Sequence, residues 1–176
     1  MANSNVSMDD DFPEEYKKQI GFFYRFINFL AYYVPGGFTW RPRLHRLRGV
    51  NIGKGVWIGQ FVYIDSVAPR AVTIMDNCII GLRSSILTHI FGEYSGKVII
   101  EKNVFIGPHC VILPNVRIGE GSVIRAGTVV SKNVPPHVLW GAPSAGPIAE
   151  VTKPLVRDEV TYQEFIQGIR PLKNKR

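Results

Sequence analysis

Histidine is the side chain best suited to exchanging protons near neutral pH, because its ordinary pKa is about 6.5. The chain contains four histidines, which are His45, His89, His109 and His137. We expect His45, which lies among arginines, at the surface or against a phosphate, and His137, which follows two prolines, in solvent. His109 lies within an uninterrupted repeat, which favours a stacked structural side chain. His89 lies where the repeat opens into a long break, so it is the candidate catalytic base.

A catalytic histidine usually has its other ring nitrogen held by an acceptor, which fixes the tautomer. Two carboxylates are candidates for this role beside His89. Glu93 lies four residues further along the same break, and Asp65 lies on the face beneath it when the repeats are stacked as coils. A backbone carbonyl would serve equally well, Glu93 could be an exposed loop acid, and Asp65 could instead bind a substrate's hydroxyl groups.

The repeat that positions these residues has a period of six. A glycine often follows the aliphatic residue of each unit, and a small or β-branched residue stands four places after it. The aliphatic positions are Ile52, Ile58, Ile64, Ile74, Ile80, Ile86, Ile100, Ile106, Ile112, Ile118, Ile124 and Val130. This period fits neither a helix nor an ordinary strand, but it fits a parallel β-helix with three short strands per coil. We predict an all-β fold of about four coils, with aliphatic side chains inside and glycines permitting the bends at the corners.

The register breaks twice, and both breaks leave the same edge of the predicted coils. Ile64 and Ile74 are ten residues apart, and Ile86 and Ile100 are fourteen apart, which leaves insertions of four and eight residues beyond the period of six. Both insertions follow the third strand of a coil. A repeat that is interrupted at one edge alone displays functional loops there.

The chain divides into four predicted segments. They are an acidic, flexible N-terminus (1–12), an N-terminal helix with a basic connector (13–49), the β-helix (50–140) and a C-terminal loop and helix (141–176). Thr161 to Glu164 have the form of a capping box, which predicts a helix that Pro171 ends. No signal peptide is apparent, so we expect the cytoplasm, with the inner membrane surface as the alternative.

The N-terminal helix is predicted by an apolar stripe at helical spacing, which consists of Tyr16, Ile20, Phe23, Ile27 and Leu30. We expect this stripe to cover the open end of the coils or a neighbouring subunit. A peripheral membrane contact through residues 16–48 is an alternative role for this helix, because Phe22, Phe26 and Phe29 add a second apolar face and a basic segment follows. The apolar run itself is too short to cross a bilayer.

Composition narrows the possible partners only slightly. Lys and Arg number 21 and Asp and Glu 14, a net charge of +7, and residues 16–49 alone contribute +7. This balance indicates an anionic partner weakly, and no aromatic and basic residues alternate on the coils as nucleic-acid binding would require. Cys78 and Cys110 occupy the small-residue position of their repeats, which favours buried packing over nucleophilic chemistry or metal binding.

Residues 40–150 resemble the hexapeptide-repeat acyltransferases. The strongest stretch is Ile99–Gly141, IIEKNVFIGPHCVILPNVRIGEGSVIRAGTVVSKNVPPHVLWG, which is similar to the final coils of that family. Arg43–Gly49, and Ile64-Asp65 with Pro69, resemble the branch that O-acetylates sugars and capsule polysaccharides. The resemblance implies a left-handed parallel β-helix, a homotrimer with active sites between subunits, acetyl-CoA as acyl donor, and His89 as the base.

The resemblance also implies which residues bind acetyl-CoA. The matching positions are Gly107, Ala126, Ser131, Lys132, Gly141 and Pro143, and Arg125, which stands where relatives have glycine, is a further candidate. Two departures are notable. Pro108 stands where galactoside enzymes donate a backbone N–H to the thioester, and proline has none. Pro143-Ser144-Ala145 replaces proline-alanine-lysine, so Arg125 or Lys153 would have to supply the lost basic contact.

We therefore expect a cytosolic, metal-independent O-acetyltransferase that transfers an acetyl group from acetyl-CoA to a saccharide hydroxyl. The acceptor would be a polysaccharide, lipopolysaccharide or sugar nucleotide. Alternatives are N-acetylation of an amino sugar and a non-catalytic scaffold subunit, since the same fold supports several functions. A γ-class carbonic anhydrase needs three converging histidines, whereas His89 and His109 lie 20 residues apart with no third nearby.

Overall fold

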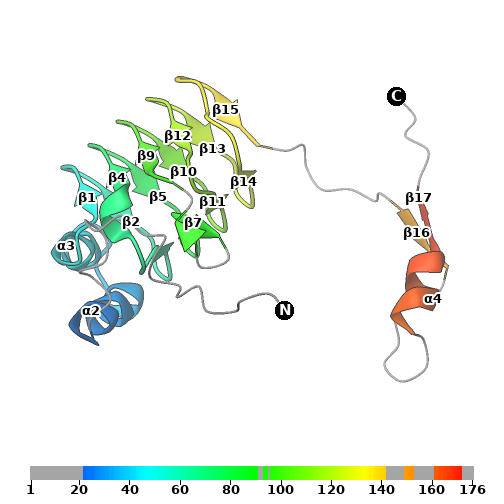
Figure 1. Ribbon diagram of the computed structural model, residues 1–176. Helices are drawn as coiled ribbons and strands as arrows, with labels where there is room; N and C mark the ends of the chain where they lie inside the picture. Colours follow the sequence, from blue (N-terminus) through cyan, green and yellow to red (C-terminus); the bar gives the residue numbers. More distant parts are fainter. Residues whose placement is uncertain (1–21, 91–92, 95, 142–148, 153–160, 172–176) are drawn as a thin grey trace, which may run out of the picture. The chain divides into compact units, whose positions relative to one another are not determined.

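The computed structural model describes residues 22–90, 93–94, 96–141, 149–152 and 161–171. The chain forms two compact units, residues 1–141 and 142–176 (Figure 1). The first unit contains the repeats, which wind into a left-handed parallel β-helix as predicted. None of the described helices is long and apolar enough to cross a membrane.

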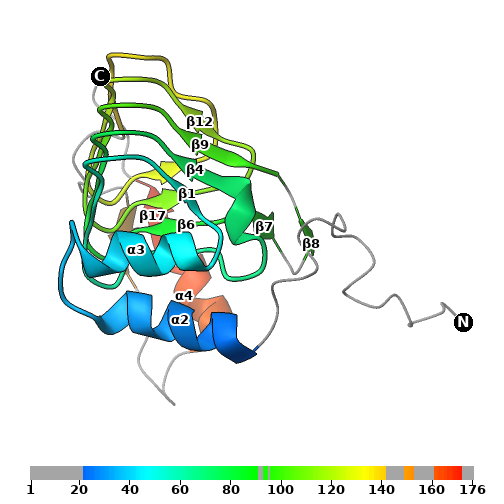
Figure 2. The same ribbon diagram turned by 90° about the vertical axis from the view of Figure 1, so that its left-hand side faces the viewer.

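The β-helix is a prism with three parallel sheets, called here faces A, B and C. Face A contains β1 (Asn51–Ile52), β4 (Val72–Ile74), β9 (Val98–Ile100) and β12 (Arg117–Ile118). Face B contains β2 (Trp57–Ile58), β5 (Ile79–Ile80), β10 (Phe105–Ile106), β13 (Val123–Ile124) and β15 (Leu139–Trp140). Face C contains β3 (Tyr63–Ile64), β6 (Ser85–Ile86), β11 (Val111–Ile112) and β14 (Val129–Val130). The chain runs through A, B and C in turn, so each set of three strands completes one coil (Figure 2).

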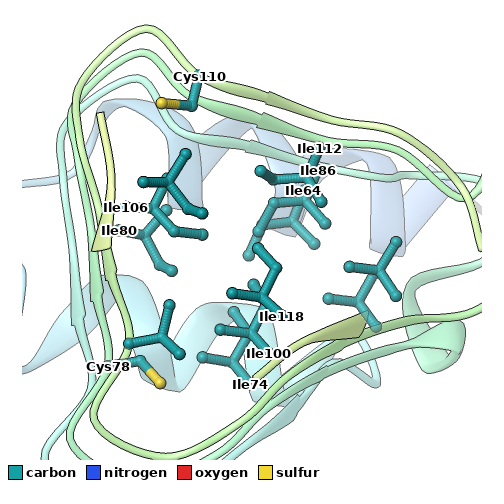
Figure 3. Close-up of a cluster of buried hydrophobic side chains, with 14 of the residues drawn as sticks. Ile64, Ile74, Cys78, Ile80, Ile86, Ile100, Ile106, Cys110, Ile112 and Ile118 are labelled. Carbon is teal, nitrogen blue, oxygen red and sulfur yellow. The ribbon is translucent and has the colours of Figure 1, made fainter. Parts of the chain in front are cut away.

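The core consists of the aliphatic residues that recur every six positions, stacked coil upon coil (Figure 3). Ile64, Ile86 and Ile112 pair in register on face C, and equivalent columns line the other two faces. Cys78 and Cys110 lie in the same core, each with its thiol directed at a backbone carbonyl. Burial raises the pKa of both thiols, which suits a packing role and makes them poor nucleophiles.

Glycine is required after the core isoleucines for a reason different from the one predicted. A Cβ added at Gly81 would lie 2.4 Å from the backbone of Gly107, and one added at Gly107 would lie 2.5 Å from the amide of Ala126. These glycines therefore permit close stacking of successive coils. The left-handed conformation at the turns falls instead on other residues, including Asn77, His109 and Asn115, each with φ near +60°. His109 is accordingly an exposed turn residue, and the prediction of a stacked structural side chain was wrong.

Two helices cover the start of the first coil, α2 (Phe22–Tyr33) and α3 (Trp40–Leu47) (Figure 2). The sequence predicts a basic connector at the residues that form α3. Pro42 is tolerated there because the first turn of a helix does not need its N–H. Of the predicted stripe, Ile27 is buried and Phe23 is exposed, while Tyr16 and Ile20 lie outside the described residues.

Arginines of α3 bind the free backbone of the first coil. Arg46 donates to the carbonyls of Ile52 and Gly53 at face A, Arg41 donates to Ile58 at face B, and Arg48 donates to Ile64 and Asp65 at face C. On each face of the prism, one guanidinium thus binds at least one carbonyl of the first coil. We call these three side chains the arginine cap.

The second unit contains β16 (Ala149–Val151), α4 (Tyr162–Gln167) and β17 (Ile169–Pro171). The predicted capping box is present, because the Thr161 hydroxyl donates to Glu164 and accepts from its amide. The helix does not continue to Pro171 as predicted. It ends at Gln167, and the next residues form a strand antiparallel to β16.

Candidate functional site

Both insertions leave the prism where the chain passes from face C to face A, as the sequence predicts; we call this the C–A edge. The first insertion begins at Asp65 and includes a short 3-10 helix, Pro69–Ala71. The second begins after β6 and forms an antiparallel hairpin of β7 (His89–Ile90) and β8 (Glu93–Tyr94). Since β3 and β6 are neighbours on face C, the two insertions begin side by side.

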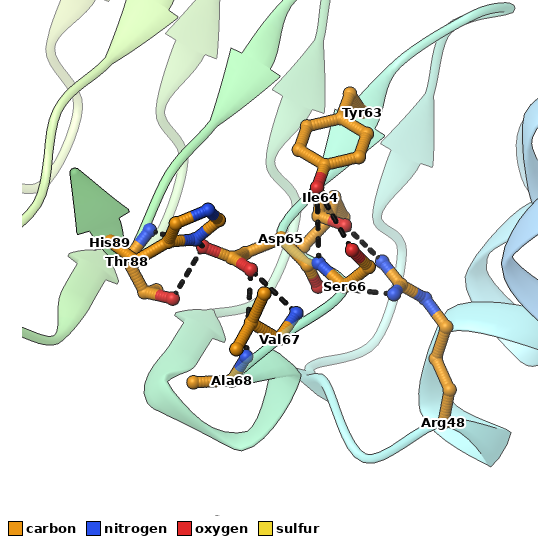
Figure 4. A network of polar contacts seen from close by, with 9 residues as sticks. All are labelled: Arg48, Tyr63, Ile64, Asp65, Ser66, Val67, Ala68, Thr88 and His89. Carbon is orange, nitrogen blue, oxygen red and sulfur yellow. Dashed lines mark hydrogen bonds and ion pairs between the residues drawn. The ribbon is translucent and has the colours of Figure 1, made fainter. Parts of the chain in front are cut away.

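Asp65 and His89 meet at this edge (Figure 4). Nδ1 of His89 lies 2.6 Å from Oδ2 of Asp65. The same oxygen accepts hydrogen bonds from the backbone amide and the hydroxyl of Thr88, at 2.7 and 2.6 Å. Oδ1 accepts from the amide of Val67 at 2.7 Å. Asp65 is completely buried, whereas the His89 side chain is 23% exposed, so the pair has an inner carboxylate and an outer imidazole.

The contacts of Asp65 decide its charge. Burial alone would raise the pKa of this carboxyl, but hydrogen bonds from Thr88, Val67 and His89 outweigh burial and hold the pKa below its ordinary value. An ionised carboxylate can only accept hydrogen bonds, so Nδ1 of neutral His89 must carry the proton. Nε2 is then left with a lone pair, and the imidazole is prepared to accept a proton there.

The buried Arg48 stabilises the Asp65–His89 pair from the interior of the protein. Its buried guanidinium donates to the carbonyls of Asp65 and Ile64 and to Nδ1 of His45. Burial lowers the pKa of Arg48 to about 10, while Tyr63 and Asp65 favour the charged form, so it remains a cation at neutral pH. His45 is buried beside it, and burial together with Arg48 and Arg41 lowers its pKa well below 6.5. The prediction that His45 lies at the surface was therefore wrong.

The positions implied for acetyl-CoA lie at two edges of the prism. Ser131 and Lys132 follow β14 and are exposed at the C–A edge, two strands beyond the one that precedes His89. Gly107, Arg125 and Ala126 lie at the turn between faces B and C, the B–C edge.

Gly141 joins this second group, because a Cβ added to it would meet the Arg125 side chain at 2.9 Å. The predicted residues thus form two groups, separated by the strands of face C.

Three predicted residues lie wholly or partly outside the described part of the chain. Pro143 and Lys153 fall among residues that the structure does not describe. The backbone of Glu93 pairs with Ile90 in the hairpin, but its side chain is not described. Of the two carboxylates considered for His89, the structure therefore brings Asp65 to it.

Sequence reasoning missed Thr88 and Arg48. Thr88 could have been found, because it stands beside His89 at the start of the insertion and its hydroxyl can serve a neighbouring carboxylate. Arg48 gave no such signal, since in a segment with four arginines the sequence does not distinguish a buried one from an exposed one. Among the described residues, no group of three or more His, Cys, Asp or Glu side chains could hold a metal ion.

Comparisons with known proteins bear on this site. A family model described as bacterial transferase hexapeptide (six repeats) matches residues 97–132, the coils that carry the strongest repeats. Over these coils the chain is similar to bacterial hexapeptide transferases. The candidate acetyltransferase YvoF of Bacillus subtilis is 40% identical to this chain over 95 residues, which are 52% of the chain and 55% of YvoF. The chain thus spans about half the length of that relative.

Solved structures resemble the chain over more of its length. A galactoside acetyltransferase in complex with coenzyme A is 25% identical, with a TM-score of 0.51 over 73% of this chain and 78% of the other. A hexapeptide-repeat acetyltransferase of Vibrio cholerae, VCA0836, complexed with acetyl coenzyme A, is 24% identical, with a TM-score of 0.52 over 64% and 76%. This second likeness shows the shared fold.

Proposed function

We propose that the protein is an acetyl-CoA-dependent O-acetyltransferase that acts on a saccharide hydroxyl, with His89 as general base. The observation that carries this proposal is the Asp65–His89 pair at the edge where the repeats open. The similarity to a galactoside acetyltransferase bound to coenzyme A supports both the donor and the acceptor class. A scaffold subunit would have no use for a buried carboxylate that fixes the tautomer of an accessible imidazole.

The proposed reaction needs one proton carrier. Nε2 of His89 takes the proton of the acceptor hydroxyl as the hydroxyl oxygen attacks the thioester carbonyl. When the carbon–sulfur bond breaks, the imidazolium returns that proton to the departing thiolate. Asp65 keeps Nδ1–H oriented throughout and stabilises the transient imidazolium, while Thr88 holds the carboxylate in place.

The donor would be held by exposed groups at the two edges. Lys132 is free of strand pairing and suits a phosphate of CoA, and the small side chain of Ala126 leaves room for the pantetheine arm. Pro108 lies at the B–C edge and has no amide hydrogen, so another donor must stabilise the developing oxyanion.

We propose a homotrimer as the working assembly. The C–A edge with His89 and the B–C edge with Ala126 lie apart on one prism, so a site that uses both requires the edges of two neighbouring chains. Face B supplies a suitable contact surface. Its outward-facing residues pair in register as an apolar ladder, Trp57, Ile79, Phe105, Val123 and Leu139. A hollow of about 420 Å³ is lined by Trp57, Ile79 and Phe105 of this ladder, and a contiguous exposed apolar surface indicates a protein contact.

The test is acetyl transfer from acetyl-CoA to a panel of saccharides, followed by release of free thiol. His89→Ala should reduce kcat by about 10²–10⁴-fold, the usual contribution of a general base. His137→Ala is the matched control, because His137 is an exposed histidine at a turn between faces A and B, away from both edges of the proposed site. Equal turnover of the two variants would remove His89 from the mechanism, and no binding of CoA in calorimetry would favour the scaffold.

A further inference from the structure

The helix pair α2–α3 carries many of the exposed aromatic rings of the first unit. Phe26, Phe29 and Trp40 are 50%, 58% and 56% exposed, and Leu47 is 67% exposed. Phe26 and Phe29 belong to α2, and Trp40, Leu47 and the exposed Arg43 belong to α3; we call this set of side chains the aromatic–arginine face. Exposed rings gathered on one short segment are costly in water unless another surface covers them.

The two helices direct this face away from the prism. On α2, Ile27 and Ala31 are buried, and helical spacing places Phe26 and Phe29 on the other side. On α3, His45 and two arginines of the cap point inward. The outer side of α3 has a hollow of about 470 Å³ lined by Trp40, Arg43, Leu44, Arg46 and Leu47.

The described helix pair α2–α3 is cationic. Arg41 and Arg46 of the arginine cap bind backbone carbonyls, which have no net charge, so these two cations are not neutralised by those contacts. Asp65 is the carboxylate that favours the charged form of Arg48. Among the described residues, neither Arg43 nor Arg46 is in an ion pair. The whole segment 16–49 contains seven Lys and Arg and no Asp or Glu.

We propose that the aromatic–arginine face docks the protein on the surface of an anionic lipid bilayer. Exposed aromatic rings on a cationic helix pair suit the headgroup region of a bilayer. There the rings enter the boundary of the acyl chains, and the arginines bind lipid phosphates. Arg43 lies over the Trp40 ring at 5.7 Å, which places a cation beside the largest ring of the face.

A second copy of this chain is the less suitable occupant. Cores of protein–protein contacts are depleted of charged residues. The apolar ladder of face B contains none, whereas Arg43 and Arg46 both line the hollow on α3. The two exposed apolar surfaces of the molecule therefore have different chemistry and fit different partners.

The experiment is co-sedimentation of the full chain with sucrose-loaded vesicles of phosphatidylcholine alone or with about one third phosphatidylglycerol. Binding should be strong only with the anionic lipid and should weaken as salt rises. Arg43→Gln should lower the partition coefficient about five-fold, the effect of one cation near an anionic surface. Arg43→Lys should restore binding, because it keeps the charge. Lys102→Gln, which removes an exposed cation elsewhere on the prism, should leave binding unchanged.

Trp40 offers a spectroscopic readout that electrostatic attraction alone would not produce. Its fluorescence should shift to the blue when anionic vesicles are added, and Trp40→Phe should abolish the shift while preserving binding. Equal binding to both vesicle types, equal losses in Arg43→Gln and Lys102→Gln, or no shift would overturn the proposal. A fall in the mass of the vesicle-free assembly in Phe26→Ser/Phe29→Ser would also overturn it, because the face would then bind a second copy. None of these measurements depends on acetyl transfer.

Discussion

Individual residues at the C–A edge show how a charge is kept inside this protein. Asp65 is buried and ionised because several donors, from Thr88, Val67 and His89, surround its two oxygens. Arg48 is buried and charged because backbone carbonyls and His45 accept from it. Removing one partner from such a network leaves the other group unsatisfied in a low-dielectric surrounding, which costs more than the lost contact alone.

Asp65→Asn should change how stability depends on pH. The pKa of Asp65 in the folded state lies below its ordinary value of 3.8, so the ionised carboxylate stabilises the fold. This contribution is fully present above the ordinary value and is lost as the pH falls through the folded value. The difference in unfolding free energy between wild type and Asp65→Asn, from urea titrations, should therefore stay constant above about pH 5 and shrink as the pH falls below about 4. A constant difference would contradict the assigned charge.

Arg48→Met should destabilise the protein by about 3–5 kcal/mol, because the carbonyls of Ile64 and Asp65 lose their donor and the buried carboxylate loses a nearby cation. Chemical denaturation measures the change. Arg43→Met is the control, since Arg43 is exposed on the same helix and its loss should cost less than about 1 kcal/mol. Similar losses in the two variants would count against the buried network.

At the scale of elements, close stacking and turn geometry are assigned to different residues. Glycine is required where one coil approaches the backbone of the next, as at Gly81, and not where the turn takes a left-handed conformation. Asparagine, which tolerates positive φ, occupies several of those turns. Two classes of turn position with different tolerance to substitution follow from this arrangement.

A pair of glycine substitutions tests this division. Gly81→Ala should destabilise by about 3 kcal/mol or more, because the added Cβ would lie 2.4 Å from the backbone of Gly107. Gly127→Ala has no neighbour within 4 Å and only a φ of +71°, so it should cost about 1 kcal/mol. Thermal unfolding of both variants is sufficient to compare them. The reverse order would show that φ, and not space, selects glycine in the coils.

The elements also show which parts of the structure can be predicted from the sequence. A strict period of six makes the coils, the buried isoleucines and the shared edge of the insertions predictable, because each depends on local repetition. The burial of His45, the helix α3 and the arginine cap were not predictable. They depend on where a non-repeating segment lies against the first coil, and many arrangements of four arginines satisfy the same sequence. For the same reason, Asp65 was predictable only as one of the two candidate carboxylates beside His89, the other being Glu93.

At the scale of the whole molecule, the apolar ladder of face B should decide the assembly. Phe105→Glu would place a carboxylate in the middle of the ladder, next to Ile79 and Val123. The proposed trimer should then dissociate to monomers in light scattering, and acetyl transfer should fall with it, because each site would lose one of its two edges. Val129→Glu on face C is the control, since Val129 is also an exposed strand residue. A Phe105→Glu variant that stays trimeric would assign the contact to another face.

The arginine cap has a further consequence for the behaviour of the chain in the cell. A parallel solenoid has no natural last strand, so an uncovered first coil could accept a strand from another molecule and seed a fibre. The three guanidinium groups already occupy some of the carbonyls that such a strand would need, with one group on each face. The cap therefore limits growth of the β-helix to the length encoded in one polypeptide, and truncations that remove α3 should expose a surface that polymerises.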